Sequence, residues 1–253
     1  MVGHDQLSTS FGAQASAYEA GRPDYPREAV AWMLEPVAAQ AQPAVADVGA
    51  GTGKLTRVAL AVGAQVTAID PDPDMLDALR TAVPDVPTHV GTAENLPLPD
   101  ASMDAVILGQ AWHWVEPVAG SREVARVLRP GGVLGLIWNI RVESTPWVRR
   151  LTEIMRASRA ERVLADGDPV VAEPFGPLEQ EQWTWVRPMT RRKLLDMARS
   201  RSYVITASDD ERARIEDGLA ELFDEVGAVD DAVVDLPYVT RAYRAIRPAH
   251  RQS

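Results

Sequence analysis

The stretch Asp47-Val48-Gly49-Ala50-Gly51-Thr52-Gly53 decides the fold. It completes a short apolar run over residues 45–48, typical of a buried strand. It is followed by residues 54–61, whose apolar side chains have helical spacing and which end before Gly63. Glycines allow the backbone to turn sharply and let a ligand approach bare main chain. Strand, glycine turn and helix in this order predict the ligand-binding edge of an α/β sheet.

An acidic residue follows the loop at an informative distance. Asp70 stands 17 positions beyond Gly53, at the end of a second apolar run over residues 66–69. A carboxylate at the end of that strand can accept hydrogen bonds from both hydroxyls of a ribose. The pair of loop and carboxylate therefore indicates a nucleotide-like ligand.

Two other glycine motifs fail against the sequence. A dinucleotide-binding G-x-G-x-x-G beginning at Gly49 needs a third glycine where Lys54 stands. A phosphate-binding P-loop needs glycine at Val48 and a hydroxyl residue at Leu55. The spacing here is G-x-G-x-G after an acidic residue, which is neither.

Helical and strand patterns alternate on both sides of the loop, and this alternation is typical of βαβ units and a parallel sheet. We expect a doubly wound α/β fold with a mostly parallel sheet. The expected helices cover residues 25–38, 54–61, 74–83 (with Asp72 or Asp74 as its N-cap) and 118–128, and the expected strands residues 45–48, 66–69, 88–90, 105–108 and 133–138.

The regular rhythm ends at Asn139. Beyond it we expect two further strands, which makes seven, and helices placed over the ligand-binding edge. Trp183 and Trp185 alternate with polar residues and are expected in the core, and the arginines of the first helix are expected to form a solvated face. The expected elements are an arginine-rich helix over 147–162, a strand over 182–186, a helix over 191–199 capped by Thr190, a helix over 211–225 and a strand over 238–243.

Composition excludes several classes of protein. The 253 residues are 46% hydrophobic and 25% charged, as in an ordinary globular protein. Neither a signal peptide nor a membrane span is visible, and we expect a cytoplasmic protein. Cysteine is absent, and the four histidines lack metal-ligand spacing, so no metal is expected. The net charge of −10 disfavours nucleic acid as a partner.

Several segments together resemble the class I S-adenosylmethionine-dependent methyltransferases of the small-molecule type. The resemblance covers about residues 8–140, and the glycine loop is the first of the segments that carry it. The other matching segments are the run from Gly91 to Asp100, the run from Ser102 to Val106, Leu128-Arg129-Pro130-Gly131-Gly132, and the N-terminal residues Phe11, Tyr18, Arg22, Pro23, Tyr25 and Pro26. The resemblance implies a methyltransferase with S-adenosylmethionine as its cofactor, a cofactor-binding half over residues 1–139, and a substrate-side insertion with the final strands over 140–253, all in one domain.

The resemblance also implies which residues bind the cofactor. Gly49, Gly51 and Gly53 would lie close to its methionine portion and ribose, and Asp70 would hold the ribose hydroxyls. Thr92 departs from the aspartate of many relatives, so its contact with the adenine amino group would be weaker. The remaining candidates are Tyr18 and Arg22 at the methionine carboxylate, Asp47 at the amino group or supporting the loop, Ala50 in the loop, Pro71 and Met75 beside adenine, Ala93 and Glu94 at the adenine amino group, and Gln110 at the end of the fourth strand.

His113 is the candidate catalytic base, because it follows the fourth strand at the ligand-binding edge. A histidine among tryptophans also fits a packing role. Trp112, Trp114 and Trp138 fit either an apolar acceptor pocket or core packing, as does Trp147. The Asn/Asp-Pro-Pro-Tyr/Phe signature of enzymes that methylate amides and exocyclic amines is absent after the fourth strand, which disfavours such acceptors.

The sequence therefore predicts transfer of a methyl group to an oxygen, carbon or nitrogen atom of a small molecule, by a monomer or homodimer. Three alternatives remain at this point. They are a methyltransferase acting on RNA or protein, a catalytically silent relative that binds the cofactor, and a nucleotide-binding oxidoreductase.

Overall fold

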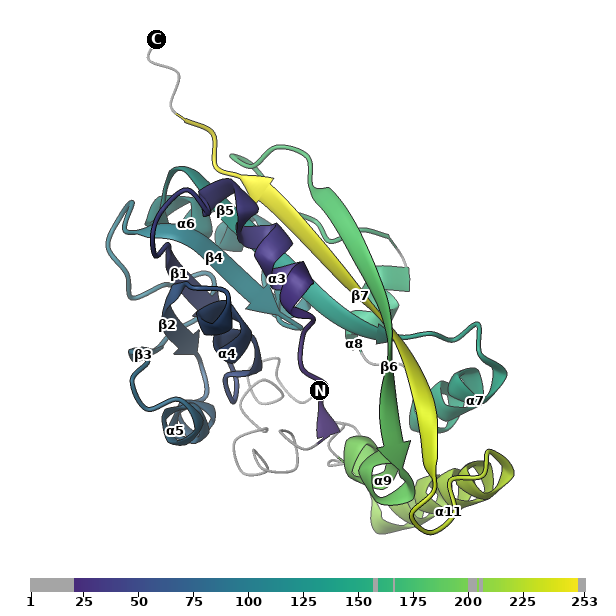
Figure 1. Ribbon diagram of the computed structural model, residues 1–253. Coiled ribbons are helices and arrows are strands. Elements are labelled where there is room, and N and C mark those ends of the chain that lie inside the picture. Colours follow the sequence, from purple (N-terminus) through teal and green to yellow (C-terminus); the bar gives the residue numbers. More distant parts are fainter. Residues whose placement is uncertain (1–20, 157–158, 166, 200–203, 205–206, 250–253) are drawn as a thin grey trace.

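Seven strands form one sheet, in the order β3-β2-β1-β4-β5-β7-β6 (Figure 1). The computed structural model describes residues 21–156, 159–165, 167–199, 204 and 207–249. The strands are β1 (Ala44–Val48), β2 (Gln65–Asp70), β3 (Thr88–Val90), β4 (Met103–Gly109), β5 (Leu128–Arg141), β6 (Glu179–Thr190) and β7 (Val233–Ile246).

The first five strands pair in parallel, whereas β7 runs antiparallel between β5 and β6. The chain adds β2 and β3 on one side of β1 and β4 onward on the other. The strand order thus reverses at β1, and such a reversal opens a crevice at the carboxyl ends of the strands. The glycine loop follows β1 at this crevice. The predicted doubly wound, seven-stranded, mostly parallel sheet is confirmed.

Helices cover both faces of the sheet. α3 (Arg27–Leu34), α4 (Lys54–Ala61) and α5 (Pro73–Ala82) lie on one face, and α6 (Pro117–Val127) lies on the other. Local sequence explains where they start. Asp72 accepts a hydrogen bond from Asp74 N at the start of α5, and Glu116 accepts bonds from the N–H groups of Val118 and Ala119 at the start of α6.

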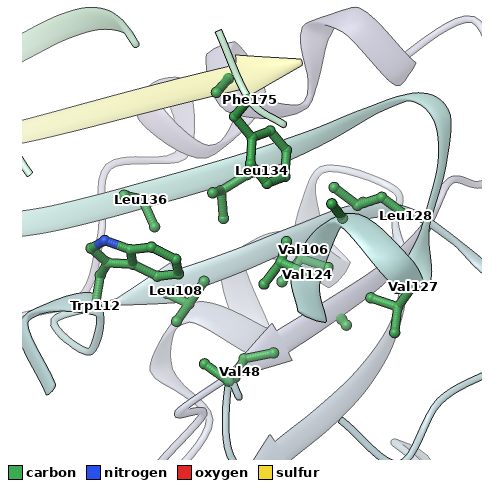
Figure 2. Packing of buried hydrophobic residues seen from close by; sticks show 14 of the residues in the cluster. Val48, Val106, Leu108, Trp112, Val124, Val127, Leu128, Leu134, Leu136 and Phe175 are labelled. Carbon is green, nitrogen blue, oxygen red and sulfur yellow. The ribbon is translucent and has the colours of Figure 1, made fainter. Parts of the chain in front are cut away.

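The core has a layer on each side of the sheet. One layer joins α3 and α4 to the strands through residues such as Met33 and Ile137. The other joins α6 and the loop after β4 to Val48, Val106 and Leu134 (Figure 2). Alternate residues of the same strands serve the two layers, which is why the strands read as continuous apolar runs.

The second half contributes α7 (Pro146–Met155), α8 (Arg159–Ala165), α9 (Arg191–Arg199) and α11 (Asp209–Glu225). α7, α9 and α11 gather beyond the end of the sheet where β6 enters α9 (Figure 1), around buried residues such as Leu151 and Phe223. Within the described ranges, no helix combines the length and apolarity that crossing a bilayer requires.

The prediction of one helix over 147–162 is wrong. α7 ends at Met155, because the next residue, Arg156, has a φ of 56°, outside the helical region, and α8 is a separate helix. Arg149, Arg150, Arg156 and Arg162 are all exposed, as expected of a solvated face. Arg156 pairs with Glu211 at 2.6 Å, and Arg150 pairs with Glu225, so both tie α7 to α11.

The tryptophans of β6 are half-buried rather than core residues. β6 is an edge strand, so its side chains are covered from fewer directions. Trp183 meets Trp32 of α3 edge-on at 6.1 Å between ring centroids. Trp185 stacks on Tyr238 of β7 at 4.9 Å.

Candidate active site

The glycine loop turns through three residues with positive φ, namely +70° at Gly49, +55° at Gly51 and +87° at Gly53. A Cβ at Gly49 would come within 2.7 Å of Ala111 Cβ, and one at Gly53 within 2.9 Å of Leu79 Cγ. At Gly51 a Cβ would meet nothing within 4 Å. Packing therefore requires glycine at the two ends of the loop, while Gly51 faces open space in which a ligand fits.

Asp70 ties the loop to the end of β2. Its Oδ2 accepts a hydrogen bond from Gly51 N at 2.8 Å, and its Oδ1 accepts one from Asp72 N at 2.9 Å. Burial raises the pKa of this carboxyl to about 6, against the lowering effect of the two N–H donors. Each carboxylate oxygen has two lone pairs, so Asp70 can hold the loop and still accept the hydroxyls of a ribose.

Asp47 is fully buried beneath the loop. Its Oδ2 accepts a hydrogen bond from the Thr56 hydroxyl of α4 at 2.6 Å, while its Oδ1 has no hydrogen-bond partner. Burial raises the pKa of Asp47 to about 7, and the nearby charge of Asp70 acts in the same direction. Asp47 thus joins β1 to α4 and supports the loop from below.

A cavity opens at the crevice between β1 and β4. Gln110 has a φ of 56° and points its side chain across the end of the sheet, where Nε2 donates to the backbone oxygen of Asn139 at 2.9 Å. The residues lining the cavity are Arg22, Pro23, Tyr25, Gly49, Ala50, Gly51, Thr52, Lys54, Leu55, Gly109, Gln110 and Asn139.

Asn139 is a site residue that the sequence analysis missed. It is buried near the end of β5, donates from Nδ2 to the backbone oxygen of Asp24 at 3.1 Å and accepts from the Thr240 hydroxyl at 2.6 Å. It therefore anchors the segment before α3 across the edge of the sheet. The only signal in the sequence was that the regular pattern stops at this residue.

The loop after β3 lies beside Asp70, because Gly91 N donates to the backbone oxygen of Asp70 at 3.2 Å. Thr92 is exposed, and Ala93 is buried. Glu94 Oε1 accepts a hydrogen bond from Glu116 N at 2.9 Å, which ties this loop to the start of α6. Pro71 and the buried Met75 follow Asp70 along the chain. These candidates thus lie on the two segments that follow β2 and β3.

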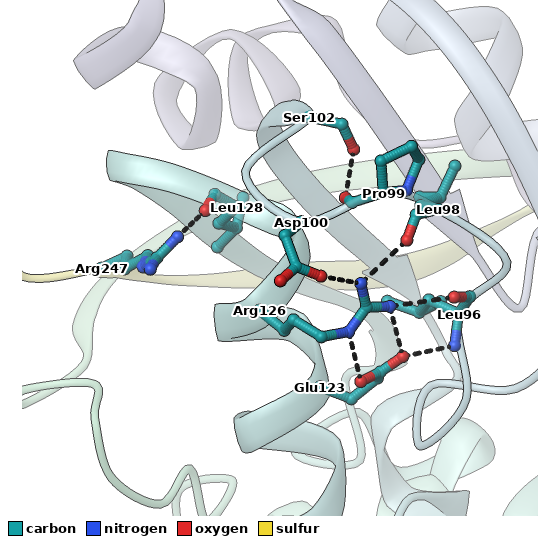
Figure 3. Close-up of polar contacts among 9 residues, drawn as sticks. All are labelled: Leu96, Leu98, Pro99, Asp100, Ser102, Glu123, Arg126, Leu128 and Arg247. Atoms are coloured by element: carbon teal, nitrogen blue, oxygen red, sulfur yellow. Dashed lines mark hydrogen bonds and ion pairs between the residues drawn. The ribbon is translucent and has the colours of Figure 1, made fainter.

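Arg126 of α6 clamps the same loop (Figure 3). Its guanidinium donates to the backbone oxygens of Leu96 at 3.1 Å and Leu98 at 2.9 Å, and to Asp100 at 2.6 Å. It also pairs with Glu123, whose carboxylate accepts from Leu96 N at 2.8 Å. The hydrogen bond from Arg126 lowers the pKa of Glu123, so this clamp stays charged at neutral pH.

His113 lies in the short helix η3 (Trp112–Trp114), directly after β4. Its Nδ1 accepts a hydrogen bond from the indole N–H of the buried Trp138 at 3.4 Å. Trp112 is also buried and donates from Nε1 to the backbone oxygen of Val170 at 2.8 Å. Both tryptophans pack in the core, whereas Trp147 is half-buried against the cluster around α7. Tyr18 and Phe11 lie outside the described residues.

Comparison with known proteins agrees with this geometry. A sequence family described as a methyltransferase domain matches residues 46–136. An uncharacterized methyltransferase of Mycobacterium tuberculosis is 46% identical over 94% of this chain and 96% of its own length. An uncharacterized methyltransferase-like protein of Schizosaccharomyces pombe is 30% identical over 92% and 94%. A crystal structure of a putative type II methyltransferase from Anaeromyxobacter dehalogenans superimposes with a TM-score of 0.70 and 25% identity, covering 90% of this chain and 99% of that one.

The chain therefore belongs to the class I S-adenosylmethionine-dependent methyltransferases. The protein is therefore an enzyme, and its cofactor is S-adenosylmethionine. The open side of Gly51, the carboxylate of Asp70 bonded to it and the cavity that Gly51 lines are the features that fit this cofactor.

Proposed function

We propose that this protein transfers the methyl group of S-adenosylmethionine to an oxygen, carbon or nitrogen atom of a small molecule. One observation carries the small-molecule part. Arg22, Pro23 and Tyr25 line the cavity, and their segment is fixed there by hydrogen bonds from Asn139 to Asp24 and from Arg187 to Gly21. A cavity walled by a fixed segment of this kind admits a small acceptor more readily than the surface of a macromolecule.

We further propose how the chain holds its cofactor. Asp70 accepts the ribose hydroxyls, while Gly51 and Ala50 lie against the homocysteine portion and Asp47 supports the loop. Gly49 and Gly53 let the loop turn. Tyr18 and Arg22 are assigned to the methionine carboxylate, Pro71 and Met75 to the faces of adenine, Thr92, Ala93 and Glu94 to the adenine amino group, and Gln110 to the methionine end.

When bound, the cofactor supplies a methyl group activated by a positively charged sulfur. The nucleophile forms its bond to the methyl carbon as the carbon–sulfur bond breaks, and the electron pair stays on sulfur. The protein has to hold the three atoms in line, which by itself supplies much of the acceleration. A base is needed only when the acceptor must lose a proton.

His113 remains the candidate for that base, but its observed hydrogen bond favours another role. In neutral imidazole only one nitrogen carries a proton. Because Nδ1 accepts from Trp138, the proton resides on Nε2, which is then a donor. In this tautomer His113 holds Trp138 in place and can donate a hydrogen bond, whereas acting as a base would require a change of tautomer.

A His113→Asn variant separates the two roles, because asparagine can accept from Trp138 but cannot take up a proton near neutral pH. If His113 is a base, turnover should fall by about 10²–10⁴-fold and the rise of rate with pH through the imidazole range should disappear. If it positions Trp138, turnover and its pH profile should stay close to wild type. Cofactor affinity, measured in parallel, controls for the fold.

The proposed function itself is tested with S-adenosylmethionine carrying a labelled methyl group. The protein is incubated with the small-molecule and macromolecular fractions of a cell extract separately, and the label and S-adenosylhomocysteine are followed by mass spectrometry. We expect labelled product in the small-molecule fraction. Label in RNA or protein would support the macromolecular alternative, and binding without any turnover would indicate a silent relative.

A further inference from the structure

An open hollow lies next to the cofactor cavity. Its volume is about 540 Å³, which is enough for a small organic molecule. Four residues line both spaces, so the two are adjacent. The shared residues are Arg22, Pro23, Tyr25 and Lys54, and the other described residues that line the hollow are Asp24, Pro26, Trp185 and Arg187.

The described lining of the hollow is rich in cationic side chains, although the protein as a whole is strongly acidic. Its described lining residues include three cations, Arg22, Lys54 and Arg187, and one carboxylate, Asp24. The whole chain carries a net charge of −10. Lys54 pairs with Asp24 at 3.2 Å, and Asp24 is also 3.7 Å from Arg57, so this carboxylate is already shared between two cations. The described cationic side chains therefore favour an anionic over a cationic ligand at the hollow.

One wall of the hollow is a fixed aromatic ring. Trp185 stacks on Tyr238 with an angle of 14° between the rings. Its indole N–H donates to the Thr240 hydroxyl at 2.9 Å, and that hydroxyl donates to Asn139 of the cofactor cavity at 2.6 Å. Trp185 is thus held in one orientation relative to the place where the methyl group is transferred.

Arg187 stands two residues beyond Trp185 on β6, so both side chains lie on the same face of the strand. Its Nη1 donates to the backbone oxygen of Gly21 at 2.9 Å, which places the guanidinium at the segment that lines the cofactor cavity. A planar guanidinium suits a carboxylate or a phosphate because it can present two parallel N–H groups.

We propose that the methyl acceptor is a small organic anion, held by its carboxylate or phosphate at Arg187 and Lys54 and by its apolar part against Trp185. This inference rests on the proposed function, since it names the acceptor class of the same site. Arg22 stays assigned to the cofactor, so the two anionic groups, that of the cofactor and that of the acceptor, have separate cations.

The test uses the protein saturated with S-adenosylhomocysteine and three probes of similar shape. Benzoate and phenyl phosphate carry the two anionic groups, and benzamide is the neutral counterpart of benzoate. Binding is followed through the indole N–H signal of Trp185 in ¹H–¹⁵N spectra, which a Trp185→Phe spectrum identifies. We expect at least one anion to shift this signal and to bind about tenfold more tightly than benzamide, roughly the effect of one charge-assisted contact.

Variants locate the anion. Arg187→Gln should reduce the preference over benzamide to within about twofold, whereas Arg187→Lys should keep only part of it, because it keeps the charge but loses the two parallel N–H groups. Arg199→Gln is the matched control. Arg199 lies on α9, pairs with Glu216 at 2.9 Å and does not line the hollow, yet its replacement changes the net charge equally.

The outcomes separate this inference from the proposed function. If wild-type protein does not bind S-adenosylhomocysteine, the proposed function fails. If it does bind, but neither anion is preferred over benzamide, the acceptor is not an anion and the inference is overturned alone. An anion preference that survives Arg187→Gln, or that Arg199→Gln removes equally, would also overturn the assignment to this hollow.

Discussion

Glycines in the cofactor loop differ in what they do, although all three have positive φ. Gly49 and Gly53 are confined by neighbouring side chains, whereas Gly51 borders empty space. We therefore predict that Gly51→Val abolishes binding of S-adenosylhomocysteine, because the new side chain occupies the space of the ligand. The affinity is measured by calorimetry on protein shown by circular dichroism to be folded.

Gly131 provides a matched control for this prediction. It also has a positive φ, of +81°, and a Cβ there would meet nothing within 4 Å. Gly131→Val thus introduces the same kind of backbone strain, about 1–2 kcal/mol, in the turn within β5 and away from the cavity. It should lower the stability of the protein without lowering its affinity for S-adenosylhomocysteine. Equal loss of affinity in both variants would show that strain, rather than occupied space, is responsible.

Asp47 makes a prediction about pH. Its pKa is raised from 3.8 to about 7 in the folded protein, so the folded state binds more protons than the unfolded state between those values. The contribution of Asp47 to stability is therefore greatest at low pH and is lost as pH rises through about 4 to 7. Asp47→Asn keeps the shape and an acceptor for Thr56 but cannot ionise.

We expect the free energy of unfolding of Asp47→Asn to increase relative to that of wild type between pH 5 and pH 8, because only the wild-type protein is destabilised by ionisation at this position. Each pKa unit corresponds to about 1.4 kcal/mol. Urea titrations at the two pH values measure it. Taking the difference between the two proteins removes the contributions of the other carboxyls, including Asp70. If the difference in unfolding free energy between the two proteins is the same at both pH values, the pKa of Asp47 is not raised by burial and the prediction is contradicted.

At the scale of elements, the loop after β3 depends on α6. Arg126 and Glu123 bond to the main chain of Leu96 and Leu98, so the loop has its shape even without a ligand. We predict that Arg126→Met accelerates hydrogen exchange at the Leu96 amide and lowers the affinity for S-adenosylhomocysteine by several-fold, while α6 stays intact. The reason is that the adenine-side loop then has to be ordered by the ligand.

Arg80→Met is the control for this element. Arg80 pairs with Asp77 on the exposed surface of α5, an arrangement that contributes about 0–1 kcal/mol, and its Nε donates to the Thr88 hydroxyl at the start of β3 at 2.8 Å. Its loss should affect neither the exchange at Leu96 nor the affinity. Unchanged affinity in Arg126→Met, despite faster exchange at Leu96, would separate the clamp from cofactor binding.

Elements set by local pattern were predicted with their bounds, whereas strands that depend on distant partners were predicted only in their middle part. Residues 88–90 and 191–199 form β3 and α9 with the predicted bounds. β5 was expected over 133–138 but runs from Leu128 to Arg141, because Leu128 pairs with Met103 of β4 and β7 pairs with β5 as far as Arg141. The helix over 147–162 failed because apolar spacing does not reveal a break at Arg156.

The candidate site divides in the same way. The glycine loop and Asp70 are recognisable because their roles depend on backbone turns and strand ends near them in the chain. Asn139 and Arg187 come from β5 and β6. Their hydrogen bonds to residues 21–24 join segments that are far apart in the sequence, and no sequence pattern indicates such bonds. Such residues are found only when the sheet order is known.

At the scale of the whole molecule, we propose that residues 1–139 and 140–253 form one domain. β7 completes the hydrogen bonding of β5, and Tyr243 and Ala245 of β7 belong to the same core layer as β4. Urea unfolding followed by tryptophan fluorescence and by far-ultraviolet circular dichroism should therefore give coincident transitions. Two separated transitions would indicate that the halves fold independently.

The central claim is that the glycine loop and Asp70 hold the cofactor, and a crystal structure with S-adenosylhomocysteine tests it most directly. We predict that both ribose hydroxyls lie within hydrogen-bond distance of the Asp70 carboxylate, with the homocysteine portion against Gly51. A ligand bound elsewhere, or a ribose held by another side chain while Asp70 contacts only Gly51 and Asp72, would contradict it.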